Sequence, residues 1–147
     1  MKKLLYLKDQ ELKQYIEKIY VGYRETVSDA KKILDKYSIG VAHNKVLHLV
    51  SLYDGITISE LLKKLKVTKQ SLNRVLKDLN KLNAIIYKKD QHDTRIKHVF
   101  LTEDGIKLSN EIFSVQKKRF YKAFLNSDSN EVISFDNVLK KIINEKL

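Results

Sequence analysis

The stretch from residue 57 to residue 82 reads TISELLKKLKVTKQSLNRVLKDLNKL and predicts two short helices joined by a tight turn. Thr57 and Glu60 have the spacing of a capping box, in which the threonine oxygen accepts a backbone amide and the glutamate reaches back to the cap. The first helix therefore begins at Thr57 and ends near Lys66. Thr68 can cap the second helix, whose apolar side chains fall on one side and leave the other side to solvent.

The solvent side of the second helix is polar and basic. An exposed helix about 10 to 12 Å across fits the major groove of B-DNA, where its first turns meet the base edges. Arg74 suits guanine, while Gln70 and Asn73 suit adenine. The candidate DNA-binding residues of this helix are Thr68, Lys69, Gln70, Ser71, Asn73, Arg74 and Lys77.

The segment after this helix predicts a β-hairpin with a basic tip. Residues 85–87 and 96–101 are rich in β-branched and aromatic side chains, and they flank the polar run 88–95. Lysines there can contact phosphates, and an arginine can enter the narrow, negative minor groove. We expect Asp93 to brace Arg95, because phosphates repel a carboxylate. The candidate DNA-binding residues of the hairpin are Lys88, Lys89, His92, Arg95 and Lys97. For each lysine taken alone, a solvated surface is the alternative interpretation.

Helical patterns extend towards the N-terminus. Apolar residues recur at steps of three and four from Leu12 to Tyr37, which predicts one long helix that ends near Gly40. A second helix is expected over residues 41–53, before a turn at Asp54-Gly55.

Helical patterns also continue towards the C-terminus. Thr102 can cap a helix that runs to about Phe124, and residues 132–142 repeat apolar side chains with the helical period. Two short helices followed by a hairpin are the order of a winged helix-turn-helix. The predicted fold class is therefore mainly α with a small β-hairpin wing (α+β).

Composition favours a polyanionic partner. The 147 residues carry 29 basic and 18 acidic side chains, for a net charge of +11. Residues 57–101 alone hold eleven basic side chains against four acidic ones, so the excess is concentrated in the predicted winged segment. The opening Met1-Lys2-Lys3 precedes an apolar run too short for a signal peptide, and we expect a cytoplasmic protein.

Several kinds of chemistry are excluded or unsupported. The chain has no cysteine, which excludes disulfides, thiolate zinc sites and thiol redox switches. His43 and His48 are five residues apart and miss the spacing of a helical zinc pair, so no metal or other cofactor is expected. No P-loop, serine-hydrolase motif or paired carboxylates in an apolar setting occur, which argues against an enzyme.

Four segments together resemble the MarR family of winged helix-turn-helix transcription regulators. They are residues 56–62, residues 65–76, Asp93-Thr94-Arg95 and the run LTEDG at residues 101–105. Two positions depart from the family pattern, since Lys66 and Asn83 stand where such proteins usually have glycine. Lys66 in a left-handed conformation would cost about 1 kcal/mol.

The resemblance implies a homodimer and assigns different roles to different parts of the chain. Residues 1–40 and 103–147 would interleave with a second copy as a dimerisation region, and residues 41–102 would form the DNA-binding domain. It also implies that the helix from Thr68 reads the major groove and that Arg95 reaches the minor groove. In this family small aromatic acids often bind between the two parts. Conceivable lining residues are Tyr23, Arg24, His43 and Tyr53.

The predicted function is a sequence-specific transcription regulator, expected to be a repressor. A dimer would place its two recognition helices about 34 Å apart and would need a pseudo-palindromic operator in double-stranded DNA. Relief by a small aromatic effector would follow the family. A nucleic-acid-binding protein without sequence preference is the alternative. Binding to a membrane surface fits less well, because the charge excess lies away from the apolar terminal helices.

Overall fold

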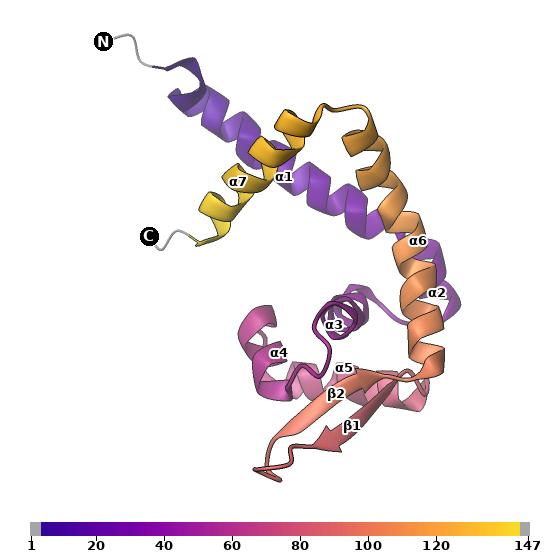
Figure 1. Ribbon diagram of the computed structural model, residues 1–147. Helices are drawn as coiled ribbons and strands as arrows, with labels where there is room; N and C mark the ends of the chain where they lie inside the picture. Colours follow the sequence, from indigo (N-terminus) through magenta and orange to yellow (C-terminus); the bar gives the residue numbers. More distant parts are fainter. Residues whose placement is uncertain (1–3, 145–147) are drawn as a thin grey trace.

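The computed structural model describes residues 4–144, and the predicted dimerisation regions include residues 1–3 and 145–147, which lie outside the described residues. A lobe of three helices and a hairpin lies on one side of the molecule, and long helices extend from it on the other side (Figure 1). The architecture is mainly α with one two-stranded antiparallel sheet, as the sequence predicted.

The N-terminal helical region is broken into two helices. A short 3₁₀ turn at Leu5–Leu7 precedes α1 (Asp9–Asp29), and α2 (Lys31–Lys36) follows after Ala30. The prediction of one long helix is therefore wrong at Ala30, whose backbone N–H bonds to the Val27 carbonyl three residues back. This tighter turn places Ala30 and Leu34 in the core while α1 continues away from it.

Three helices build the lobe: α3 (Val41–Leu52), α4 (Ile58–Leu65) and α5 (Lys69–Lys81). The caps that the sequence predicted are present. Thr57 accepts the Glu60 amide at 3.1 Å, and Thr68 accepts the Ser71 amide at 3.1 Å. Lys66 ends α4 in the left-handed conformation with φ 53°, which allows α5 to begin after a short turn.

The hairpin consists of β1 (Ile85–Lys89) and β2 (Lys97–Leu101), paired so that Ile85 faces Leu101. Both strands differ slightly from the prediction, because β1 continues through Lys88 and Lys89 and leaves the loop to residues 90–96. The segment before α4 adds to this sheet: the Val99 N–H donates to the Ile56 carbonyl at 2.8 Å. The hairpin is thus attached to the helix-turn-helix by backbone pairing.

Two further helices complete the chain, α6 (Glu103–Leu125) and α7 (Ser129–Asn144). Thr102 caps α6 by accepting the Gly105 amide at 2.9 Å. Phe124 near the end of α6 packs edge-to-face with Phe135 of α7, with ring centroids 6.0 Å apart, and so holds the turn between the two helices.

One hydrophobic core runs through the lobe and into its flanking helices. Leu47 of α3, Leu61 of α4, Leu72 of α5 and Val99 of β2 are almost fully buried. Ala30, Leu34, Leu108 and Ile112, from α1–α2 and α6, belong to the same cluster. The flanking helices therefore complete the core of the lobe and fix its position.

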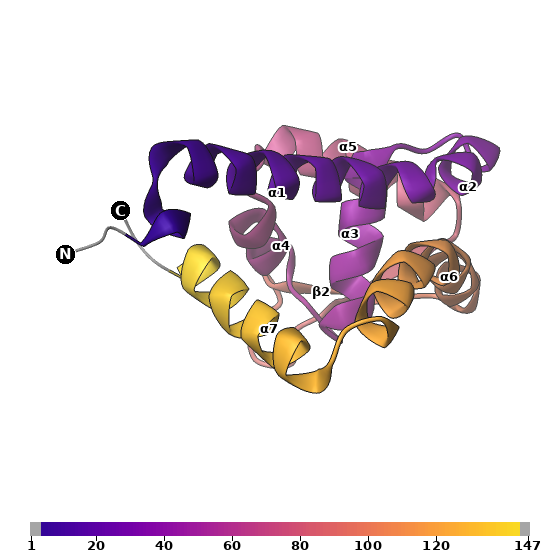
Figure 2. The same ribbon diagram turned by 90° about the horizontal axis from the view of Figure 1, so that it is seen from above.

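The outer halves of the long helices expose apolar faces. On α1 these include Leu12, Ile16, Ile19 and Tyr23, and on α7 they include Ile133, Val138, Ile142 and Ile143. Seen from above, α1 and α7 extend from the α6 end towards the same side as two separate arms (Figure 2). Across residues 4–144, no helix is both long and apolar enough to cross a membrane.

Candidate nucleic-acid interface

Helix α5 is held against the lobe by one buried face and one polar contact. Its leucines at 72, 76 and 79 are buried, and Asp78 accepts a bond from the His43 ring of α3, with Nε2 and Oδ2 2.9 Å apart. That bond holds the pKa of Asp78 below its ordinary value, so the carboxylate stays ionised at neutral pH. These contacts on the core side fix the orientation of α5.

The opposite face of α5 is exposed along the whole helix. Lys69, Gln70, Asn73, Arg74 and Lys77 all lie on it. Within residues 4–144, no hydrogen bond or ion pair involves the side chains of Gln70, Asn73 or Arg74. Thr68 differs, because its hydroxyl is committed to the amide and the hydroxyl of Ser71. The free amides and guanidinium are the groups that read base edges.

The lysines of the hairpin lie on both faces of the sheet. Side chains alternate along a strand, so Lys88 lies on one face, while Lys89 and Lys97, which face each other in the register, lie on the other. Lys88 places its ammonium 4.8 Å from the centre of the Phe100 ring, and Lys97 lies 5.8 Å from that of Tyr87. His92 is exposed in the loop. The hairpin can therefore offer cations to two sides.

Arg95 lies at the tip of the hairpin, with its side chain 89% exposed. Its Nε and Nη2 donate to the two carboxylate oxygens of Asp93, each at 3.0 Å, and its backbone N–H also donates to Asp93. The bond from Arg95 holds the pKa of Asp93 below its ordinary value. Asp93 braces Arg95 in this geometry, which leaves the far edge of the guanidinium free.

Two residues that the sequence analysis did not select complete the hairpin. His98 of β2 contacts Asp90, at the start of the loop, and the carbonyl of Gly55, which precedes α4. His98 and Asp90 are eight residues apart and come together only because the hairpin closes. Sequence spacing alone gave no indication of the pair.

None of the four candidate ligand residues lines either of the two surface hollows described below. Tyr23 lies under Lys45 and Tyr53 under Lys64, with ammonium-to-ring distances of 5.2 and 4.3 Å. Arg24 pairs with Glu25 on the surface of α1, and His43 is bound to Asp78.

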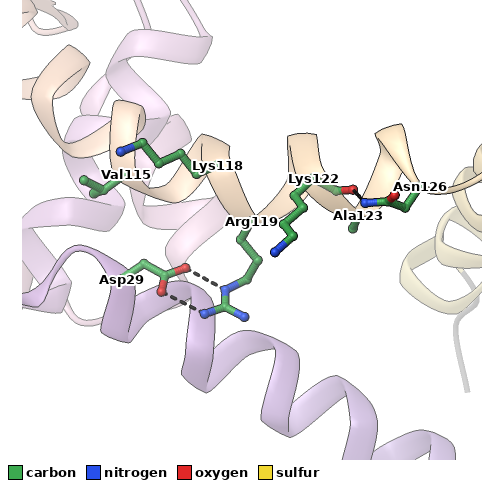
Figure 3. Close-up of a pocket in the computed structure, with 7 residues that line it drawn as sticks. All are labelled: Asp29, Val115, Lys118, Arg119, Lys122, Ala123 and Asn126. Atoms are coloured by element: carbon green, nitrogen blue, oxygen red, sulfur yellow. Dashed lines mark hydrogen bonds and ion pairs between the residues drawn. The ribbon is translucent and has the colours of Figure 1, made fainter.

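Two surface hollows are lined by other residues. In one, Arg119 of α6 forms a two-pronged ion pair with Asp29 of α1, at 2.6 and 2.8 Å, and Lys122 points to the same side (Figure 3). The other lies between α3, β2 and α6, beside Ser51 and Phe100. In the described part of the chain, no group of three His, Asp or Glu side chains is arranged to hold a metal ion.

Comparison with known proteins identifies the family. A model of the MarR family matches residues 41–96, which span the helix-turn-helix, strand β1 and the hairpin loop. The HTH-type transcriptional regulator PetP of Rhodobacter capsulatus is 34% identical over 140 residues, covering 95% of this chain and 84% of PetP. The chain belongs to the MarR family. It is a transcription regulator of the winged helix-turn-helix type, and its relatives are regulators and not enzymes.

Solved structures of MarR-family proteins share this fold. S. aureus MepR in its DNA-binding conformation has a TM-score of 0.77 at 24% identity, over 88% of this chain and 96% of MepR. A MarR regulator from Methanosarcina mazei has a TM-score of 0.71 at 26% identity, over 88% and 94% of the two chains. The MepR–DNA complex has a TM-score of 0.67 at 23% identity, over 88% and 95%. Complexes with DNA thus occur among the proteins that share the fold of this MarR-family regulator.

Proposed function

We propose that this MarR-family regulator is a sequence-specific repressor that binds a pseudo-palindromic operator as a homodimer. The observation that carries the proposal is the position of α5. Its apolar face is buried and its polar face is free, while the Asp93–Arg95 pair stands at the tip of the adjoining hairpin. One element is thus available for the major groove and another for the minor groove.

The dimer is supported by the exposed apolar faces of α1 and α7. Ile16 on α1 and Ile142 on α7 are each more than half exposed, on helices that run away from the core. Large unpartnered apolar surfaces of this kind mark interfaces. A second copy covers them and brings two α5 helices to successive half-sites about 34 Å apart.

Selection from fragmented genomic DNA of the source organism tests the proposal. At about 0.15 M salt, non-specific phosphate binding is weak, and we expect a shared pseudo-palindrome with half-sites about one turn apart. Deletion of the regulator should then raise expression of the gene that lies beside the selected sequence on the chromosome. Recovery without a common sequence would indicate a protein that binds charge alone.

Two variants separate base reading from phosphate contact. We expect Arg74→Ala to lower affinity for the selected sequence by about 1 to 3 kcal/mol and to relax preference at one position. Lys88→Ala should weaken selected and random DNA equally and reduce the salt slope by about one. Lys31→Ala, at an exposed α2 lysine paired with Asp35, is the control cation away from this interface. Equal loss on both kinds of DNA with Arg74→Ala would contradict the assigned role.

Relief of repression by a small aromatic carboxylate is the remaining part of the proposal. Tyr23 and Lys45 place a ring and an ammonium 5.2 Å apart between α1 and α3, and these two groups suit an aromatic acid. Benzoate should release the protein from the selected DNA, and Tyr23→Leu should raise the concentration required. Unchanged DNA binding at millimolar benzoate would remove this part and leave the repressor intact.

A further inference from the structure

The ring of His98 is held between two hydrogen-bond acceptors. Its Nδ1 lies 2.7 Å from the carbonyl oxygen of Gly55, and its Nε2 lies 2.8 Å from Oδ1 of Asp90. A carbonyl and a carboxylate accept hydrogen bonds and donate none, so both ring nitrogens must donate. Only the protonated imidazolium has two N–H groups. The contact geometry therefore selects the charged form of His98.

The surroundings of His98 act in the same direction. The Gly55 carbonyl first, and then Asp90, raises the pKa of His98 above its ordinary value of 6.5. Glu60 of α4 adds a second negative charge on the helix-turn-helix side. The positive charges nearby are Lys88, its partner across the hairpin, and Lys97, its neighbour in β2. The side chains of His98 and Asp90 are 28% and 26% exposed, so water only partly screens their attraction.

Asp90 also forms hydrogen bonds with the backbone at the hairpin tip. Its second oxygen, Oδ2, accepts the backbone N–H groups of His92 and Asp93, at 3.0 and 3.1 Å. The carboxylate of Asp93 in turn holds the backbone and guanidinium of Arg95. A continuous series of hydrogen bonds thus runs from the connection before α4, through His98 and Asp90, to Arg95.

We propose that His98 is a positioning residue for DNA binding, whose imidazolium clamps the hairpin loop to the helix-turn-helix and so sets Arg95 relative to α5. The inference rests on the proposed function, because it requires that the hairpin contact DNA. When His98 loses its second proton, one ring nitrogen presents a lone pair to an acceptor and that side of the clamp opens. The hairpin tip is then less constrained relative to the recognition helix.

The direction of the pH effect follows from the raised pKa of His98. A raised value means that the clamp contributes fully below the ordinary histidine value and is lost as pH rises through the value in the folded protein. We expect affinity for the selected duplex to fall by about tenfold as the clamp opens, the equivalent of one hydrogen bond to a charged group. The fall should lie above about pH 6.5.

Two substitutions distinguish a titrating clamp from simple packing. Asp90→Asn keeps an oxygen for the loop amides and offers an N–H group to His98, so the neutral ring can satisfy both neighbours. The His98 midpoint should therefore fall, and the loss of affinity at alkaline pH should disappear. His98→Gln removes the titrating group and should give affinity that does not depend on this transition. His48→Gln, at an exposed histidine of α3 outside the proposed interface, is the control and should keep the wild-type transition.

The experiment combines NMR titration of the histidine ring protons with DNA binding at each pH, using the selected duplex and a random duplex. A His98 midpoint at or below that of a free histidine, or one that Asp90→Asn leaves unmoved, would overturn the clamp. The same pH profile of affinity in wild type and His98→Gln would overturn the positioning role. If no sequence preference appears at any pH, the proposed function fails, while the NMR titration still decides the clamp.

Discussion

Gly105 lies where α6 passes closest to the backbone that leads into the hairpin. A Cβ atom at this position would come within 1.9 Å of the Ala84 carbonyl oxygen. That oxygen already accepts the Thr102 N–H at 3.0 Å, so neither segment can move without losing a bond. We expect Gly105→Ala to destabilise the protein by about 3 kcal/mol, measured by urea unfolding.

Gly22 in α1 provides the matched control for Gly105. A Cβ atom there meets nothing within 4 Å. Gly22→Ala should stabilise the helix by about 0.5 to 1 kcal/mol, because alanine loses less backbone entropy on folding. Equal effects of the two substitutions would contradict the steric argument.

Lys66 has φ 53°, in the left-handed region that disfavours side chains with a Cβ atom. Lys66→Gly and Lys66→Ala both remove the charge, so the difference between them isolates the backbone. We expect the glycine variant to be the more stable by about 1 kcal/mol in thermal unfolding. At Lys63, inside α4, the order should reverse by a similar amount of about 1 kcal/mol, because glycine weakens a regular helix. The same order at both positions would contradict the prediction.

Among the elements, α1 and α6 are tied together by Asp29 and Arg119, which are 90 residues apart. The bond from Arg119 holds the pKa of Asp29 below its ordinary value of 3.8. A lowered value means that this carboxylate stabilises the fold above about pH 4 and that the contribution is lost as pH falls through the value in the folded protein.

Asp29→Asn should therefore lower stability at neutral pH and flatten the loss of stability on acidification, measured by urea unfolding at a series of pH values. Asp35→Asn breaks a pair with Lys31 within one helix, where both side chains are well exposed. This control should change stability by no more than about 0.5 kcal/mol. If the free energy of unfolding falls as steeply on acidification in Asp29→Asn as in wild type, Asp29 is not the source of the acid dependence.

The starts of three helices could be predicted from the sequence, but the break between α1 and α2 could not. Helix starts were predictable because Thr57, Thr68 and Thr102 cap them through local bonds that span three residues. The break at Ala30 was not, because alanine is a strong helix former and the tighter turn serves a core that only the tertiary structure assembles.

The same contrast holds for the site. The free face of α5 followed from helical periodicity, and the Asp93–Arg95 brace followed from local spacing and charge. The bond between His43 and Asp78 joins residues 35 apart, and the contact of His98 with Gly55 joins residues 43 apart. Nothing in a single sequence indicates such pairs, because their distances depend on how the elements pack.

For the whole molecule, the exposed apolar faces of α1 and α7 predict that two copies of the chain associate and bury these faces. Ile142, on α7, has 62% of its surface exposed. If a second copy covers it, Ile142→Glu places a charge in an apolar interface and should weaken the dimer by at least about a hundredfold. Asn137→Glu, five residues earlier at an exposed polar position on a different side of α7, adds the same charge and should leave the dimer unchanged.

Sedimentation across a range of protein concentrations measures both variants. A wild-type protein that stays monomeric at micromolar concentration would remove the dimer and, with it, the argument for paired half-sites.

One residue, Thr102, separates the end of β2 from the start of α6, and it also caps the helix. Its 23 residues form a rod about 35 Å long that joins the base of the hairpin to the turn into α7 (Figure 1). A continuous helix of this length moves as a rigid body. If it tilts by about 5° about its α7 end, its hairpin end moves by about 3 Å, the length of one hydrogen bond. If two copies meet at the α7 end, as proposed, small adjustments there become displacements at the hairpin large enough to change its contacts with DNA.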